Sequence, residues 1–432
     1  MPMLDVPAPR PIITRRTFLK GTAAAGVATV ALPALRSTVA LAAPGGSYTG
    51  DVVVNVFARG GMDGLGAFPP IDAAHGAAQY KAARPTTYVD PADAIDLGNG
   101  FGMHPALSAL KPLWDAGHLA VVHAVGYPLD NRSHFSSQVF IDSGTGGTDL
   151  TSGWIARHFD TLADGNTGLR GVGLPHAEGS LAEAPSTVSM GDIRSFRING
   201  VPNNANTAAK TALAALYAAS TANPLLSGQT AQLLASLDMV TTSAAATLAA
   251  QNASLYPKND YFGYCMSQIG GLIKAGVGLE ASATDASYGW DLHSNYGTTA
   301  SGNMHDNLLG LGNVLAAFYN DLGPTLMAKT TIVVMTEFGR TFRENSSLGL
   351  DHGRGSVMLV LGGAVKGGQV LGTWPSLDPT TINSVGDALP VTLDYRYVLA
   401  EIVEKRLLNS NLTGVFPDFT LDPTKRLNLF GP

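Results

Sequence analysis

The sequence has very few cysteines and a low proportion of charged residues. A single cysteine, Cys265, stands among 432 residues, so neither an intramolecular disulfide nor a thiolate cluster for zinc or an iron–sulfur centre can form. Charged residues make up only 14% of the chain. The remainder, 45% hydrophobic with 50 glycines, is typical of a globular protein with a large core and many tight turns, and it argues against a disordered chain.

Several motifs of common enzyme classes are also absent. The chain has no G-x-S-x-G elbow, no Walker A sequence and no dinucleotide fingerprint, which argues against the usual serine hydrolases, P-loop nucleotide-binding proteins and nicotinamide enzymes. Beyond residue 42, no apolar run is long enough to span a bilayer. We therefore expect a soluble product without a stable membrane anchor.

The first 42 residues have the pattern of a twin-arginine signal peptide. Thr14 to Lys20 (TRRTFLK) precedes an Ala-rich apolar stretch from Gly21 to Leu41, and Ala40-Leu41-Ala42 offers a small-x-small cleavage site. A membrane anchor or a buried helix is the alternative, but Pro33 and Arg36 interrupt the stretch. The pattern predicts export to the periplasm or beyond, with the twin-arginine translocation machinery as a partner.

The charge balance makes nucleic acid a poor partner. Residues 1 to 42 carry five basic groups and one acid, so cleavage after Ala42 changes the formal charge from −6 for the whole chain to −10 for the mature part. A protein of that charge is repelled by phosphate backbones. We expect no nucleic-acid binding.

Predicted strands alternate with predicted helices along the mature chain. The alternation favours an α/β fold with a mostly parallel sheet covered by helices on both faces, built as one domain over residues 43–432. The expected strands are Asp51–Ala58, His118–Val125, Ser287–His293, Thr330–Glu337 and Ser356–Leu361. The expected helices are Pro105–Ala116, Ser152–Leu162, Tyr261–Ala275, Met304–Leu322 and Thr392–Leu407.

Two stretches differ in composition. Pro202 to Asn259 is rich in Ala, Thr, Ser, Asn and Leu with a helical pattern, and we expect a helical insertion or lid there, or simply another covering layer. Gly362 to Pro379, rich in Gly and Pro, is typical of a loop with an edge strand.

Metal-type ligands fall at the ends of predicted strands. Asp63 follows the first strand, Asp291 and His293 end another, and Glu337 ends a third. In open α/β sheets the loops at the carboxyl ends of strands meet in one crevice. Carboxylate oxygens with imidazole nitrogens suit zinc, manganese, magnesium or calcium, so the pattern predicts a divalent metal site.

A further carboxylate–histidine pair, Asp351 and His352, stands just before a strand. Adjacent side chains usually point apart, so one would ligate while the other orients a neighbouring ligand. Each motif taken alone also has a plainer interpretation. Asp63 in GGMDG is a common turn residue, and Asp351-His352 could be a loop pair.

Three residues are candidates for catalysis or for binding a substrate anion. Ser133 stands at the start of a predicted helix, where it would be a nucleophile or an ordinary N-cap. Arg132 would add positive charge beside it. Arg340 follows Glu337 and would hold a substrate anion or only pair with Glu337 or Glu344. Asp394, in Asp394-Tyr395-Arg396, is explained by capping of the following helix.

Six motifs in order give the chain a specific resemblance over about Asp51 to Leu408. The chain resembles family 1501 of bacterial domains of unknown function, which is commonly exported by the twin-arginine route and is grouped with the alkaline phosphatase and sulfatase-like superfamily. The motifs are Arg59–Gly64 (RGGMDG), Arg132–Phe135 (RSHF), Asp291–Asn295 (DLHSN), Thr336–Thr341 (TEFGRT), Asp351–Gly353 (DHG) and Asp394–Arg396 (DYR).

The resemblance implies an alkaline phosphatase-like fold around a metal centre and assigns roles by position. Asp63 matches the first-strand metal aspartate of the superfamily, and Ser133 falls where its hydroxyl nucleophile follows the second strand. Asp291 and His293 match the later Asp…His ligand pair, Glu337 replaces a strand-end aspartate, and His352 matches a final histidine ligand. No Cys-x-Pro-x-Arg motif is present, which argues against an ordinary sulfatase.

Two functions follow as hypotheses. The first is an exported metal-dependent hydrolase of phosphate or sulfate esters on a small-molecule or polymer substrate. The alternative is an exported binding or assembly protein that keeps the fold without turnover. A redox protein with a preloaded cofactor has less support, because the chain lacks both a dinucleotide fingerprint and a cysteine cluster.

Overall fold

The computed structural model describes most of the chain beyond the predicted signal peptide. Its described residues are 50–162, 169–175, 179–184, 187–193, 201, 202, 205–218, 234, 237, 238 and 252–431. The predicted signal peptide lies outside them, as does most of the predicted insertion at 202–259. Within that insertion, Asn206–Ala218 forms helix α7 and Ala253–Leu255 forms the short helix η5.

A nine-stranded sheet runs through the described chain in the order β10-β4-β9-β8-β1-β7-β5-β6, with β11 pairing on β4. The sheet is mixed, because β9 runs antiparallel to β4 and β8, whereas the other strand pairs of this sheet, within the described residues, are parallel. The strands are β1 (Val52–Phe57), β4 (Leu119–Gly126), β5 (Gly171–Leu174), β6 (Thr187–Ser189), β7 (Ala281–Asp285), β8 (Thr330–Met335), β9 (Ser356–Leu361), β10 (Gln369–Leu371) and β11 (Leu393–Asp394).

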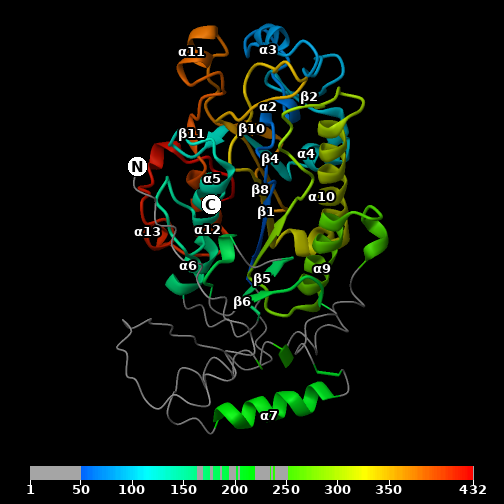
Figure 1. The fold of residues 1–432 in the computed structure, drawn as a ribbon, viewed down its shortest axis with the longest axis vertical. Coiled ribbons are helices and arrows are strands. Elements are labelled where there is room, and N and C mark those ends of the chain that lie inside the picture. Colours follow the sequence, from blue (N-terminus) through cyan, green and yellow to red (C-terminus); the bar gives the residue numbers. More distant parts are fainter. Residues whose placement is uncertain are drawn as a thin grey trace, which may run out of the picture. The chain divides into compact units, whose positions relative to one another are not determined.

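Helices pack on both faces of this sheet, as Figure 1 shows. Side chains alternate along β1, so that Val54 and Val56 pack into one core and Val53 and Phe57 into the other. The first core takes side chains from η1 (Pro105–Leu110), α4 (Lys111–Asp115), α9 (Tyr261–Ala275) and α10 (Asn303–Met327). The second takes them from α5 (His134–Ser143), α6 (Trp154–Thr161), α12 (Arg396–Lys405) and α13 (Leu412–Val415).

Short elements complete the described chain. The hairpin β2–β3 forms a separate two-stranded sheet. The remaining elements are α2 (Gly64–Ala67), α3 (Ala77–Ala83), β2 (Ile95–Gly98), β3 (Phe101–Met103), η2 (Gly179–Leu181), α11 (Pro379–Ser384) and η6 (Pro423–Lys425). Within the described residues, no helix combines the length and the apolar character needed to cross a membrane.

The reversal of β9 decides which loops share an edge of the sheet. Strands β1, β4, β7 and β8 run in one direction, so their last residues lie at one edge, which we call the carboxyl edge. Because β9 runs the opposite way, its first residue, Ser356, lies at this edge beside Val125 of β4. A loop that precedes β9 therefore reaches the same place as loops that follow the other strands.

Most predicted elements are confirmed, and the α/β class with them. The expected strand at Ser287–His293 is wrong: the strand is β7, Ala281–Asp285, and the later segment is a loop. The alternating apolar residues Tyr288, Trp290 and Leu292 imitate a strand, but they pack into the core from this loop. The true strand is made of small residues (ASATD), which give a weak hydrophobic signal.

Two predicted helices have different limits from those expected. Pro105–Ala116 divides into a 3₁₀ turn and α4, because Pro112 lies in the first turn of α4. The helix expected from Thr392 begins only at Arg396, since Leu393–Asp394 pairs with β4. Asp394 Oδ1 accepts a hydrogen bond from the Arg396 backbone N–H at 2.9 Å, as capping predicts.

Glu280, a buried carboxylate just before β7, makes the stability of the fold depend on pH. Glu280 is bonded to His158 Nε2 at 2.6 Å and to Arg170 Nε at 2.7 Å. Burial alone would raise the pKa of Glu280, but these partners outweigh it and lower the pKa from 4.5 to about 2.

We expect this cluster to stabilise the fold above pH 4.5 and to lose that contribution as the pH falls towards 2, because the folded-state pKa is the depressed one. The contribution is about 3 kcal/mol. Urea unfolding at a series of pH values should show Glu280→Gln losing less stability than the parent between pH 4.5 and 2. Parallel losses in the two proteins would contradict the assignment.

Candidate metal centre

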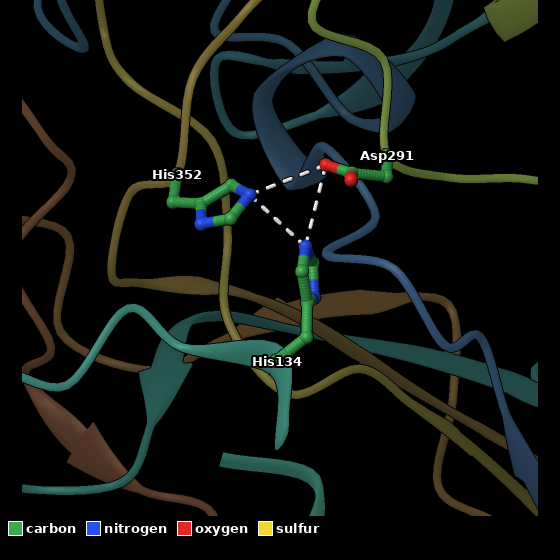
Figure 2. Close-up of side chains that lie close together, drawn as sticks. All are labelled: His134, Asp291 and His352. Carbon is green, nitrogen blue, oxygen red and sulfur yellow. Dashed lines mark hydrogen bonds and ion pairs between the residues drawn. The ribbon is translucent and has the colours of Figure 1, made fainter. Parts of the chain in front are cut away.

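Three side chains from distant parts of the chain converge at the carboxyl edge (Figure 2). His134 is the first residue of α5, Asp291 lies in the loop after β7, and His352 lies in the loop before β9. The Nε2 atoms of His134 and His352 are 3.0 Å apart. Asp291 Oδ1 lies 3.3 Å from the first of these nitrogens and 3.2 Å from the second.

His293 extends this group. Its Nε2 lies 3.0 Å from His352 Nε2 and 3.0 Å from Asp291 Oδ1. Side-chain exposure is 45% for His293 and 20% for His134. The centre therefore passes from a half-buried side to an open one, where a ligand from solvent has access.

The second nitrogen of each imidazole determines which tautomer is present. His134 Nδ1 lies 2.6 Å from Glu337 Oε1, His293 Nδ1 lies 2.6 Å from Asp351 Oδ1, and His352 Nδ1 lies 2.6 Å from the Arg132 carbonyl oxygen. An ionised carboxylate or a carbonyl oxygen can only accept, so each Nδ1 must donate. In its neutral form, each ring then presents the lone pair of Nε2 to the centre.

Lone pairs and a carboxylate oxygen this close together repel one another unless a metal ion or a proton lies between them. The donor set fits a divalent transition-metal ion. Ligand atoms at 2.0–2.1 Å from a tetrahedral zinc ion are about 3.3 Å apart, and the three distances among His134, Asp291 and His352 are 3.0, 3.2 and 3.3 Å. Histidines whose other nitrogen donates to a carboxylate or carbonyl are typical of metal sites.

Arg340 holds Asp291 in place through an ion pair. Its guanidinium is buried and lies 2.8 Å from Asp291 Oδ1. It also donates to the backbone carbonyls of Gly60, Gly61 and Trp290. Burial would raise the pKa of Asp291, but Arg340 and the neighbouring histidines lower it to about 2. Asp291 is thus held as an anion.

A glycine turn after β1 supports Glu337. The Gly60 N–H donates to both Glu337 oxygens, at 2.9 and 3.1 Å. Gly61 has φ +67°, and a side chain there would lie 2.8 Å from the Phe338 ring. Phe338 in turn packs against the rings of His134 and His352, with centroid distances of 4.7 and 5.0 Å. The turn therefore requires glycine.

A comparison with known families gives a match over much of the chain. The model of a family described as protein of unknown function (DUF1501) matches residues 51–388, more than half of the chain. The chain belongs to the DUF1501 family. The matched region contains all four residues of the centre, whereas Asp394–Arg396 lies beyond it. A search of curated proteins gives no match.

The structure places Asp291, His293 and His352 at the centre and gives two other predicted ligands a supporting position. Glu337 and Asp351 each hold the Nδ1 of a histidine and do not lie in the group of ligand atoms. Burial would raise the pKa of Glu337, but His134 and Gln138 outweigh it and lower the pKa. The hydrogen bond to His293 lowers the pKa of Asp351.

Asp63, predicted as a ligand, lies in a buried ion pair instead. Its oxygens are 2.5 and 3.1 Å from the guanidinium nitrogens of Arg84. They also accept from the Tyr296 hydroxyl at 2.7 Å and from the Gly66 N–H at 3.0 Å, which caps α2. This carboxylate is fully engaged, so the DUF1501 chain does not bring it to the grouped ligands.

Of the predicted catalytic residues, Ser133 is exposed to solvent and Arg132 is hydrogen-bonded to the backbone. Ser133 is the N-cap residue of α5, as expected, but its exposed side chain makes no capping hydrogen bond. Arg132 donates to the carbonyls of His352 and Val385 at 3.1 and 2.6 Å. It therefore ties the His352 loop to its surroundings through backbone oxygens.

His134 is the residue that sequence reasoning missed. It stands in the RSHF motif, one position after Ser133, and attention fell on the serine as a possible nucleophile. Its position in the sequence could have identified it. A histidine that begins the helix after β4 lies at the same edge of the sheet as the acids after β7 and β8.

The support that Asp351 gives to His293 leads to a testable result. Asp351→Ala should weaken metal affinity roughly tenfold, because the hydrogen bond to Asp351 no longer keeps the His293 imidazole in one tautomer and one orientation. Stability should change little, since the Asp351 side chain is 56% exposed. Competition with a chromogenic chelator measures the affinity. Asp387→Ala, which removes another surface acid, serves as the control, and equal affinity in all three proteins would rule out this role.

Proposed function

We propose that the protein is an exported, metal-dependent hydrolase of phosphate or sulfate esters with an alkaline phosphatase-like fold. The observation that carries this proposal is the grouping of the His134 and His352 Nε2 atoms with Asp291 Oδ1, beside His293, with every Nδ1 held by an acceptor. Such a site costs electrostatic energy unless it binds a metal ion or takes up a proton.

The donor set narrows the choice of metal. Magnesium and calcium prefer sites made of oxygen ligands, whereas His134, His293, His352 and Asp291 supply mainly imidazole nitrogen. Zinc is the ion that this set favours, with manganese as the second choice. Bound there, the ion would supply Lewis-acid catalysis by polarising the ester group and activating water.

The chain's own residues would position an anionic ester beside that ion. The ten-residue helix α5 begins at His134, so the backbone N–H groups of its first turn, which lack helical partners, belong to the same segment as this ligand and would favour an anion there. The exposed Ser133 hydroxyl lies next to His134 in the chain. It is available as a nucleophile or as a hydrogen-bond donor to the ester, while Arg340 keeps Asp291 ionised.

The test combines metal content with turnover. Protein purified after export should carry about one equivalent of a transition metal and should hydrolyse an aryl phosphate or an aryl sulfate, with activity lost in chelator and restored by zinc or manganese. Ser133→Ala distinguishes the two roles of the serine, because only a nucleophile is indispensable for turnover.

A non-catalytic exported binding or assembly protein is the alternative. Bound metal without hydrolysis of either ester class would favour that alternative. Protein that neither contains metal nor changes its melting temperature in chelator would contradict both the centre and the hydrolase. Export itself is tested separately, by replacing Arg15 and Arg16 with lysine and following the location of the chain.

A further inference from the structure

A cavity of about 300 Å³ lies at the carboxyl edge between α5 and the sheet. Its walls come from β1, β5, β7, α5 and η2. One wall residue, Gln138, donates to Glu337 Oε1 at 2.8 Å, and the same oxygen holds His134. Phe135, at the cavity, follows His134 in the chain. The cavity therefore adjoins the metal centre through Glu337.

The cavity contains a buried polar atom that lacks a partner. Asn55 is 2% exposed, and its Oδ1 accepts no hydrogen bond from any described residue. Its Nδ2 donates to the Ser180 hydroxyl at 2.9 Å. A hydroxyl that accepts can still donate its own hydrogen. Asn55 and Ser180 thus offer an incoming group one acceptor and one donor, and an unsatisfied buried acceptor costs about 1–3 kcal/mol.

The charges around the cavity disfavour an anion. Arg59 is paired with Asp142 at 2.8 Å and with Asp285 at 3.0 Å, which leaves two carboxylates for one guanidinium. A ligand carrying a phosphate or carboxylate would be repelled there, whereas hydroxyl groups would find both donors and acceptors.

Apolar side chains, among them Val139, Leu174 and Phe135, provide much of the remaining surface. Phe135 is 89% exposed, so its ring is open to a ligand, whereas Phe57 is buried beneath the Arg59 guanidinium. A flat face of C–H groups packs well on such a ring. Sugar rings combine this kind of face with hydroxyl groups that both donate and accept.

We propose that this cavity binds a neutral, hydroxyl-rich ring of the sugar type, as the part of the substrate next to the ester. The proposal rests on the proposed function for its link to catalysis, but the cavity uses none of the metal ligands. A second cavity of about 350 Å³ shares Val139, Asp142 and Gly179 with the first. This neighbouring cavity offers room for a second sugar unit.

The test measures binding without turnover. Saturation-transfer NMR on the full chain would use neutral methyl hexopyranosides of the glucose, galactose and mannose series and their disaccharides, with and without chelator. Phe135→Ala should weaken binding about five- to tenfold. Leu408→Ala, which removes another exposed side chain (76% exposed), is the matched control and should leave binding unchanged. Asn55→Leu removes the buried amide and should abolish binding in protein that still melts cooperatively.

Each result decides the question. Glycoside binding that survives chelator, is weakened in Phe135→Ala and is lost in Asn55→Leu, with parental metal content, supports the sugar site even if no ester is hydrolysed. Absence of binding for every neutral glycoside overturns the sugar site, and so does binding that is indifferent to both variants. Neither of these failures affects the metal centre, because metal content and chelator sensitivity are measured independently.

Discussion

His352→Ala is expected to abolish high-affinity metal binding. The substitution removes the Nε2 that lies 3.0 Å from both His134 and His293 and 3.2 Å from Asp291. Losing a direct ligand should exceed the roughly 10- to 100-fold loss that follows removal of an outer hydrogen-bond partner. The measurement is metal equivalents retained after gel filtration, together with ester turnover, which should fall to the level of chelator-treated parent.

A second histidine variant provides the control. His305→Ala removes an imidazole that pairs with Asp306 and stands 6.1 Å from His104, apart from the grouped ligands. It should keep both the metal and the activity of the parent. Should His352→Ala retain a full equivalent of metal at parental affinity, the assignment of the centre would be wrong.

Asp63→Asn should have the largest effect on stability and little effect on metal content. The substitution leaves the guanidinium of Arg84, which is 0% exposed, without its counter-ion. Breaking a buried ion pair in this way costs about 3–5 kcal/mol. Asparagine can still cap α2, because its side-chain oxygen accepts from Gly66 as Asp63 does, so the change isolates the charge.

Urea unfolding gives the free energy, and elemental analysis gives the metal. Asp115→Asn breaks an exposed pair with Lys111 and should cost less than about 1 kcal/mol. If Asp63→Asn lost metal without losing stability, Asp63 would be a ligand, as the sequence alone suggests. The pair of measurements therefore separates the two interpretations of the GGMDG aspartate.

The site was predictable in part, for reasons that particular residues make clear. Asp291 and His293 could be named because a strand was expected to end at them; that strand is wrong, but the loop after β7 that holds them lies at the same edge. His352 could be named because it forms a carboxylate–histidine pair with Asp351 just before a strong strand signal, β9. Glu337 and Asp351 were expected as ligands because residue type alone does not separate a ligand from the group that orients it. Only contacts with His134 and His293 make that distinction.

The sequence by itself determined the α/β class, most strands and helices, and the family. It did so because periodicity and short motifs are local properties of the chain. The tertiary structure decided the rest. The reversal of β9 brings a residue before a strand, His352, beside residues that follow other strands. The burial of Arg84 draws Asp63 into an ion pair and away from the grouped ligands. Both outcomes depend on which distant groups meet, and no local pattern records that.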